Sequence, residues 1–157
     1  MWYPEASSDD DHSSTEIRSF HNPSDEAIRR LLEGVRRIAV VGLSVNPSRP
    51  SNAVAGYLRR HGYEIVPVNP NYPSVFGERS YPSLDDVPGR VDVVDVFRRS
   101  DAVWPVAVAA IRIGALALWL QESVIDEDAA LRAQSAGLTV VMDRCIAVEH
   151  ARLVAPA

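Results

Sequence analysis

The sequence predicts an α/β fold built on an open, doubly wound parallel sheet, with five main strands and helices on both faces. From Arg37 onwards, apolar runs of strand length alternate with amphipathic stretches. Runs such as "IAVV" and "ALALWL" are apolar at successive positions, as expected for strands covered by helices on both sides. A closed barrel of eight strands and eight helices would need more than 157 residues.

The individual elements follow from this alternation. A lead-in helix is expected with Asn22 as its N-cap and Pro23 as its first residue. Gly62, Gly114 and Gly137 each follow an amphipathic stretch, at the position where a left-handed backbone commonly ends a helix. Strands are expected over residues 37–41, 63–68, 91–97, 115–120 and 139–142, and helices over residues 51–61, 101–113 and 126–136, with a closing helix around "EHARL".

One crossover is irregular. Residues 70–90 contain four prolines and two glycines, a composition typical of loops. We expect a short strand near Val75 and at most one turn of helix over residues 83–87.

The chain divides into a tail and one domain. Residues 1–21 are rich in Ser, Asp and His without apolar periodicity, so we expect a disordered or loosely docked acidic tail before a single domain over residues 22–157. The first sixteen positions hold five of the 21 acidic residues and no basic one, leaving 16 acidic residues against 16 arginines. The basic excess typical of nucleic-acid-binding proteins is therefore missing.

Composition also bears on location and chemistry. No apolar run approaches the roughly 18 residues that span a bilayer, and the first residues lack the basic and apolar regions of a secretory signal. A soluble, cytoplasmic protein without a membrane partner is expected. The single Cys145 cannot form an internal disulfide or a cysteine-based metal site, and no cluster of metal ligands is predicted. The chain has no lysine, which excludes Schiff-base chemistry and the lysine of a Walker loop.

The stretch "VVGLSVNPSRPSN", residues 40–52, forms the first predicted strand-to-helix turn. In an open parallel sheet such turns face the ligand crevice, and the following helix offers free N–H groups and the positive end of its dipole. Ser44, Ser48 and Ser51 could donate hydrogen bonds to phosphate oxygens, and Arg49 could add a charge. The alternative is that the serines cap the helix and Arg49 is solvated.

The dinucleotide fingerprint is incomplete. Of the three glycines in G-x-G-x-x-G only Gly42 is present, and the second strand ends in "VPVNP" without a carboxylate for a ribose diol. This favours NADP or coenzyme A (CoA) over NAD. Arg98 and Arg99 follow the strand over residues 91–97 and could pair with phosphates beside Phe97, or one of them could pair with surface acids.

Asp92 and Asp95 lie in that same predicted strand, three positions apart. They therefore face opposite sides of the strand and cannot form a catalytic pair. We expect both carboxylates to be buried and hydrogen-bonded.

Six segments together resemble a known family: "GLSVNPSRPS", "GYEIVPVNP", "YPSLDDVP", "VDVVDVFRRS", "WLQ" and "VVMDRCIAVEHARL". The chain resembles, over residues 24–153, the small stand-alone CoA-binding proteins. Their Rossmann-like fold is similar to the CoA-binding domain of the succinyl-CoA synthetase α subunit. Where the family is often aromatic, after Pro50-Ser51, this chain has Asn52.

The resemblance implies a ligand site in three parts. The first turn would hold the diphosphate, the end of the second strand would border the adenosine, and Phe97, Arg98 and Gln121 would lie toward the pantetheine arm or its phosphates. The candidate cofactor-binding residues are Gly42, Leu43, Ser44, Arg49, Pro50, Ser51, Asn52, Val68, Asn69, Pro70, Phe97, Arg98, Arg99 and Gln121.

No catalytic group is predicted. The larger synthetases carry a phosphorylatable histidine in a further domain, which does not fit into 157 residues, and His61 and His150 are interpreted as surface or packing residues. Cys145 is a candidate redox thiol, because Arg144 or a helix N-terminus would favour its thiolate and so a mixed disulfide with CoA. The alternative is that it is a small buried apolar residue.

Three functions remain open. The first is a CoA- or acyl-CoA-binding protein without catalytic machinery. The second is an NADP(H)-dependent enzyme on the same fold, although no substrate domain is visible. The third is a regulatory adaptor that meets a protein partner, and a homodimer is also left open.

Overall fold

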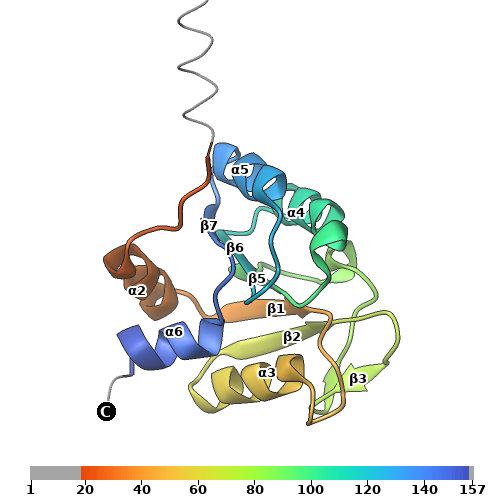
Figure 1. The fold of residues 1–157 in the computed structure, drawn as a ribbon. Helices are drawn as coiled ribbons and strands as arrows, with labels where there is room; N and C mark the ends of the chain where they lie inside the picture. Colours follow the sequence, from red (N-terminus) through yellow and green to blue (C-terminus); the bar gives the residue numbers. More distant parts are fainter. Residues whose placement is uncertain (1–18, 156–157) are drawn as a thin grey trace, which may run out of the picture.

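The computed structural model describes residues 19–155 (Figure 1). Most of the predicted acidic tail, residues 1–18, lies outside the described residues. Within the described part, the chain forms a parallel sheet with helices on both faces. The predicted doubly wound α/β fold is therefore confirmed.

Five parallel strands form the sheet in the order β2-β1-β5-β6-β7. Each begins or ends within two residues of its predicted position. All residues of β5 and β6 are buried, as expected for central strands covered on both faces. The strands are β1 (Arg37–Val41), β2 (Glu64–Val68), β5 (Val93–Val96), β6 (Ala117–Leu120) and β7 (Thr139–Val141).

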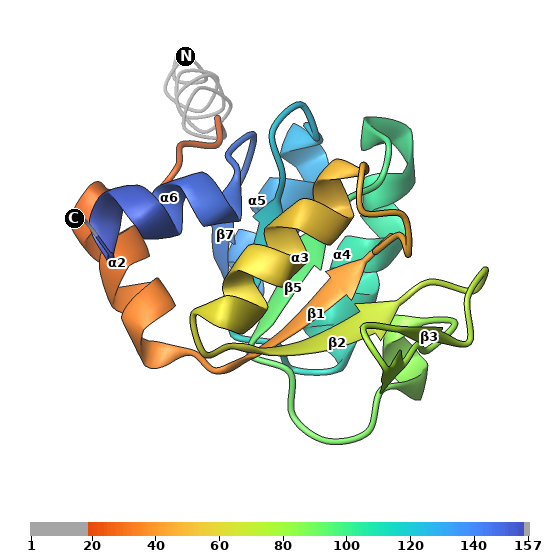
Figure 2. The same ribbon diagram turned by 90° about the horizontal axis from the view of Figure 1, so that it is seen from below.

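Two apolar layers hold the helices against the sheet. On one face lie α2 (Asp25–Gly34), α3 (Pro50–Arg60) and α6 (Ile146–Leu153), and on the other lie α4 (Val103–Arg112) and α5 (Glu127–Ser135) (Figures 1 and 2). A 3₁₀ turn, η2 (Ser100–Ala102), leads into α4. Between residues 19 and 155, no helix has the length and apolar character needed to cross a membrane.

The proline-rich crossover contains a small hairpin. The strands β3 (Ser74–Val75) and β4 (Glu78–Arg79) pair antiparallel, and η1 (Leu84–Asp86) supplies one 3₁₀ turn. The backbone of Tyr81 then bonds to the outer edge of β2. Tyr81 N donates to Pro67 O at 3.0 Å, and Tyr81 O accepts from Asn69 N at 2.8 Å. The short strand and the helical turn were predicted, whereas the second hairpin strand was not.

The predicted start of the first helix is wrong by two residues. Ser24 is the N-cap, and its Oγ accepts from Ala27 N at 3.1 Å. Asn22 has a different role, because its amide donates to Met142 O at 3.0 Å and accepts from Met142 N at 2.8 Å. These two bonds fix the chain beside the end of β7 before α2 begins.

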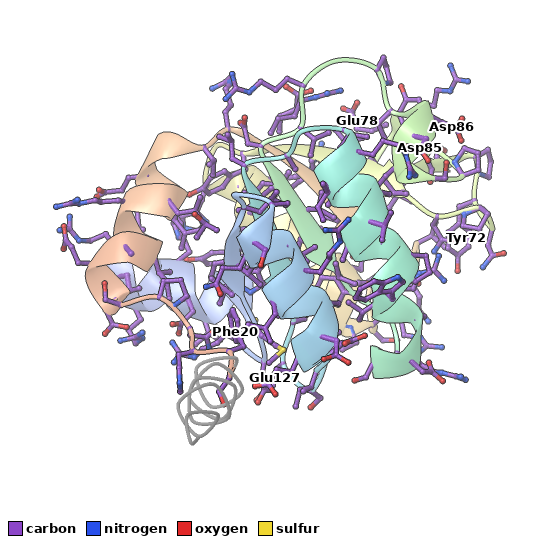
Figure 3. All side chains as sticks on the ribbon, turned by 90° about the horizontal axis from the view of Figure 1, so that it is seen from above. Phe20, Tyr72, Glu78, Asp85, Asp86 and Glu127 are labelled. Atoms are coloured by element: carbon purple, nitrogen blue, oxygen red, sulfur yellow. The ribbon has the colours of Figure 1, made fainter. Side chains whose placement is uncertain are left out.

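Packing begins within the range predicted as tail. Phe20 is 8% exposed, and its backbone N–H donates to Glu127 Oε2 at 3.0 Å. Figure 3 shows the two residues together at the start of α5. The segment just before α2 is therefore attached to the opposite face of the sheet.

Candidate functional site

The candidate site lies at the carboxyl ends of the strands. From β1 the chain passes to β2 on one side and then to β5, β6 and β7 on the other, so the topology reverses between β1 and β5. Such a reversal opens a crevice where α/β sheets bind ligands. A cleft of about 730 Å³ lies here, within the size range of small-molecule sites.

The cleft brings together ten of the predicted residues from four segments of the chain. They follow β1, β5, β6 and β7. These residues are Gly42, Ser44, Arg49, Pro50, Ser51, Phe97, Arg98, Arg99, Gln121 and Cys145.

Five other predicted residues are not part of the cleft lining: Leu43, Asn52, Val68, Asn69 and Pro70. Three of them brace the first turn. Asn52 Nδ2 donates to Ser44 O at 2.8 Å, Asn69 Nδ2 donates to Leu43 O at 3.1 Å, and Val68 O accepts from Gly42 N at 2.8 Å. Leu43 is fully buried in the apolar layer, and Pro70 is exposed.

Gly42 brings the ends of β1 and β5 into contact. Its φ is +90°, and a Cβ atom there would lie 2.2 Å from Phe97 O. Phe97 N in turn donates to Val41 O at 2.9 Å. Only glycine can occupy this position without moving one of the two backbones.

The first turn exposes the N-terminus of α3. Ser51 is 5% exposed, and its Oγ accepts from Ser44 N at 3.0 Å, so Ser51 braces the turn and does not cap the helix. Ser48 donates its hydroxyl to Asn46 Oδ1 at 2.9 Å. Within residues 19–155 no side chain caps α3, and its first turn has no acidic residue.

The helices α2 and α5 differ from α3 in both respects. Ser24 and Asp126 cap them, and acidic residues follow in their first turns. The positive dipole end of α3 is therefore left uncompensated beside the cleft, where it favours an anion.

Arginine side chains add positive charge to the same rim. Arg49 and Arg98 are exposed, and neither has an ion-pair partner among residues 19–155. Arg99 instead pairs with Asp101 at 2.8 Å, the surface alternative foreseen for one of the two arginines. Glu122 also lines the cleft and partly offsets this charge.

Gln121 connects the cleft to a buried carboxyl. It is 4% exposed, and its Nε2 donates to Asp95 Oδ1 at 2.7 Å. Asp95 is fully buried, and burial raises its pKa to about 8. Asp95 is thus buried and hydrogen-bonded through Oδ1, as expected, whereas its Oδ2 has no hydrogen-bond partner among the described residues. Asp92 is half-buried and accepts from Arg36 N and Arg37 N at 2.9 and 3.0 Å.

Cys145 lines the cleft directly before α6 and is half-buried. The backbone of the preceding residue, Arg144, is held by a side chain of β6, because Trp119 Nε1 donates to Arg144 O at 2.8 Å. The Arg144 guanidinium pairs with Glu149 at 3.1 Å, so its charge is not free to act on the thiol alone. Cys145 itself is one of the lining residues of the cleft.

Six residues of the lining were not predicted: Asn46, Val54, Tyr72, Glu122, Ser123 and Val124. Three of them directly follow Gln121, so the rule that strand carboxyl ends gather could have found them. Ser123 is held by Asp143, whose Oδ1 accepts from Ser123 N at 2.7 Å. Tyr72 lies in the proline-rich crossover, where no periodicity in the sequence predicts the path of the chain. Figure 3 shows Tyr72 well away from Phe20 and Glu127.

His61 and His150 lie outside the cleft. His150 is 4% exposed, and its Nδ1 lies 3.0 Å from Tyr57 Oη. His61 is exposed and stacks on the Tyr57 ring, with 4.1 Å between ring centroids. Both positions agree with the interpretation of these histidines as packing and surface residues.

Comparison with known proteins identifies the family. Residues 36–151 match the family model described as "CoA binding domain". The uncharacterized protein YneT of Bacillus subtilis (strain 168) is 41% identical over 130 residues, which are 83% of this chain and 96% of YneT.

Solved structures agree with this match. A crystal structure of the PH1109 protein redesigned for binding has a TM-score of 0.85 and 41% identity, and covers 88% of this chain and 97% of its own. A hypothetical protein from Pyrococcus horikoshii OT3 has a TM-score of 0.82 and 40% identity, over 84% and 93% of the two chains. A dinucleotide-forming acetyl-coenzyme A synthetase from Ca. Korarchaeum cryptofilum has a TM-score of 0.66 and 28% identity; the match covers 74% of this chain but 27% of the enzyme. The resemblance inferred from the sequence motifs is confirmed: the chain belongs to the CoA-binding domain family.

Proposed function

We propose that this protein binds CoA or an acyl-CoA in the cleft at the carboxyl ends of the strands, without catalysing a reaction on it. The observation that carries the proposal is the N-terminus of α3, which no side chain of residues 19–155 caps, which has no acidic residue in its first turn, and which lies beside Arg49 and Arg98. A helix N-terminus of this kind favours a phosphate group.

The diphosphate of CoA would lie against the turn between β1 and α3. The Ser51 hydroxyl accepts from Ser44 N and can still donate its own hydrogen to a phosphate oxygen. Arg49 and Arg98 would add charge-assisted hydrogen bonds from opposite sides of the reversal point. Gly42 has no side chain, which lets the turn that would hold the diphosphate pack directly against the Phe97 carbonyl.

The two ends of the ligand would then lie along different strands. Tyr72, from the segment after β2, offers an aromatic surface on the side where the adenosine was expected. Asn69 would support this side indirectly, since its amide already bonds to Leu43 O and Asn71 N. The pantetheine arm would extend past Phe97 toward Gln121 and Cys145.

The side chains around the cleft support binding over catalysis. Among the described lining residues Glu122 is the single carboxylate, and none is a histidine. An acid–base pair of the usual kind is therefore not assembled at the site. The cytoplasmic location, a protein partner and a homodimer stay predictions from the sequence.

Thermal unfolding with CoA, acetyl-CoA, NADP and NAD tests the proposal. A ligand at 100 times its dissociation constant should stabilise the fold by about 2.7 kcal/mol. Stabilisation by CoA or acetyl-CoA that exceeds the effect of both dinucleotides would support it. A larger effect of NADP would favour the NADP(H)-dependent enzyme, and no effect of any of the four would favour the adaptor.

A further inference from the structure

A buried carboxyl beneath the cleft is left incompletely bonded by the fold. Asp95 lies in β5 between Val40 of β1 and Trp119 of β6 and has no exposed surface. Its Oδ1 accepts from Gln121 Nε2 at 2.7 Å, whereas its Oδ2 has no partner among residues 19–155. Trp119 cannot serve it, because its Nε1 donates to Arg144 O. A leucine has the same branched shape and would avoid the cost of an unpaired buried oxygen.

The partner of this carboxyl reaches the ligand space. Gln121 directly follows β6 and lines the cleft. Its backbone is fixed as well, since Gln121 O accepts from Val124 N at 2.8 Å. One N–H of the amide is held by Asp95, which leaves the amide oxygen as the acceptor for a ligand, beside the second N–H hydrogen.

We propose that Asp95 is a positioning residue, which fixes Gln121 with its amide oxygen toward the cleft as an acceptor for an N–H group of the ligand. The inference rests on the proposed function, because the pantetheine arm of CoA carries amide N–H groups that match such an acceptor. It assigns to this end of the cleft a preference for ligands with an amide-containing arm over nucleotides that lack one.

The charge state of Asp95 suits this role. Burial raises its pKa to about 8, so the carboxyl is mostly neutral at pH 7. It can therefore orient Gln121 without placing a negative charge beneath an anionic ligand. No similar reason connects Asp92 to the cleft, because Asp92 accepts hydrogen bonds from the backbone N–H groups of Arg36 and Arg37 at the start of β1.

Calorimetric titration with two ligands tests the inference. The probes are CoA and adenosine 3′,5′-bisphosphate, which has the nucleotide but no pantetheine arm. Asp95→Leu should weaken CoA binding about tenfold, the value of one lost hydrogen bond, and leave bisphosphate binding unchanged. Asp95→Asn keeps an acceptor and should bind CoA within about twofold of wild type. Equal weakening of both ligands, or no change for CoA, would overturn the inference.

Two further variants distinguish the positioning of Gln121 by Asp95 from a general loss of structure in Asp95→Leu. Asp92→Asn is the matched control, with the same residue type just before the same strand, and should leave CoA affinity unchanged. In a Gln121→Met background, Asp95→Leu should have no further effect on CoA affinity, because its effect acts through Gln121. An undiminished effect in that background would contradict the proposed route.

A measurement without ligand keeps the inference testable if the proposed function fails. In ¹⁵N-resolved NMR spectra, the Gln121 side-chain amide should show two separate, exchange-protected hydrogens in the wild type. Asp95→Leu should abolish that protection. If the wild-type protein binds neither probe, the proposed function is wrong, and so is the role of Gln121 as an acceptor for the ligand. The amide spectrum then still shows whether Asp95 positions Gln121. A Gln121 amide that exchanges freely in the wild type would overturn the positioning itself.

Discussion

The carbonyl oxygen of Phe97 lies 2.2 Å from the point where a Cβ atom on Gly42 would be placed. The two residues follow β1 and β5, the strands between which the topology reverses. Their contact therefore joins the two chain segments on either side of the reversal point. A side chain at Gly42 would collide with backbone atoms of Phe97. Rotation of a side chain could not relieve this clash, so the backbone itself would have to move.

Gly42→Ala should destabilise the fold by at least about 2 kcal/mol, from the positive φ and the clash with Phe97 O together. Chemical denaturation measures this directly. The control is Gly34→Ala, since Gly34 lies in α2 with no described atom within 4 Å of an added Cβ. That variant should be neutral or slightly more stable. Equal effects at the two positions would refute the close approach.

Arg98→Ala should weaken CoA binding by about tenfold or more, because a charge-assisted hydrogen bond to phosphate would be lost. The loss should shrink as salt is added, since the side chain is exposed. Arg30→Ala is the control: Arg30 is exposed on α2 and pairs with Glu26. Calorimetric titration at two salt concentrations gives the result, and an unchanged affinity in Arg98→Ala would exclude this arginine from the phosphate site.

The free energy of unfolding should fall as pH rises, because the buried Asp95 carboxyl titrates at a higher pH in the folded protein than in the unfolded chain. Its pKa is raised from the ordinary value of 3.8 to about 8 in the folded state. Between these values the folded protein keeps a proton that the unfolded chain has released, so the stabilising contribution present at low pH is lost as pH rises. Relative to Asp95→Asn, the wild type should lose unfolding free energy between pH 4 and pH 8 and change little above. The slope should approach roughly 1.4 kcal/mol per pH unit. Parallel stability curves for the two proteins would show that Asp95 does not titrate in this way.

Cys145 should react with CoA disulfide if the pantetheine arm ends beside it. The thiolate would attack one sulfur and release one CoA thiol, which leaves a mixed disulfide on the protein. Mass spectrometry after incubation should show one CoA moiety at Cys145, removable by reductant. Excess adenosine 3′,5′-bisphosphate should slow the reaction by occupying the nucleotide part of the cleft. A thiol that stays unmodified would end the prediction of a redox role.

Much of the fold could be predicted from hydrophobic pattern and glycine positions. Apolar residues dominate the five strands of the parallel sheet, and glycines with positive φ follow the ends of the helices after β1, β5 and β6. The first helix was placed two residues early because Asn22 and Ser24 are both good N-caps. The choice depends on Met142, which is 120 residues from Asn22 in the sequence.

The site could be predicted less completely. Ten of the lining residues were predicted from their positions after the strands, because the carboxyl ends of parallel strands share one edge of the sheet. Sequence could not separate residues that line the cleft from those that brace it, such as Asn69 and Asn52, because both kinds are polar and lie close to the ends of strands or the start of α3. Tyr72 was missed because the proline-rich crossover has no period from which its path could be inferred.

The most direct test of the central claim is a crystal structure of the protein grown with millimolar CoA. We expect the diphosphate at the N-terminus of α3, within hydrogen-bond distance of Ser51 and the guanidinium of Arg49 or Arg98, with the arm directed toward Gln121. A cleft that stays empty under these conditions, or CoA bound elsewhere on the protein, would contradict it.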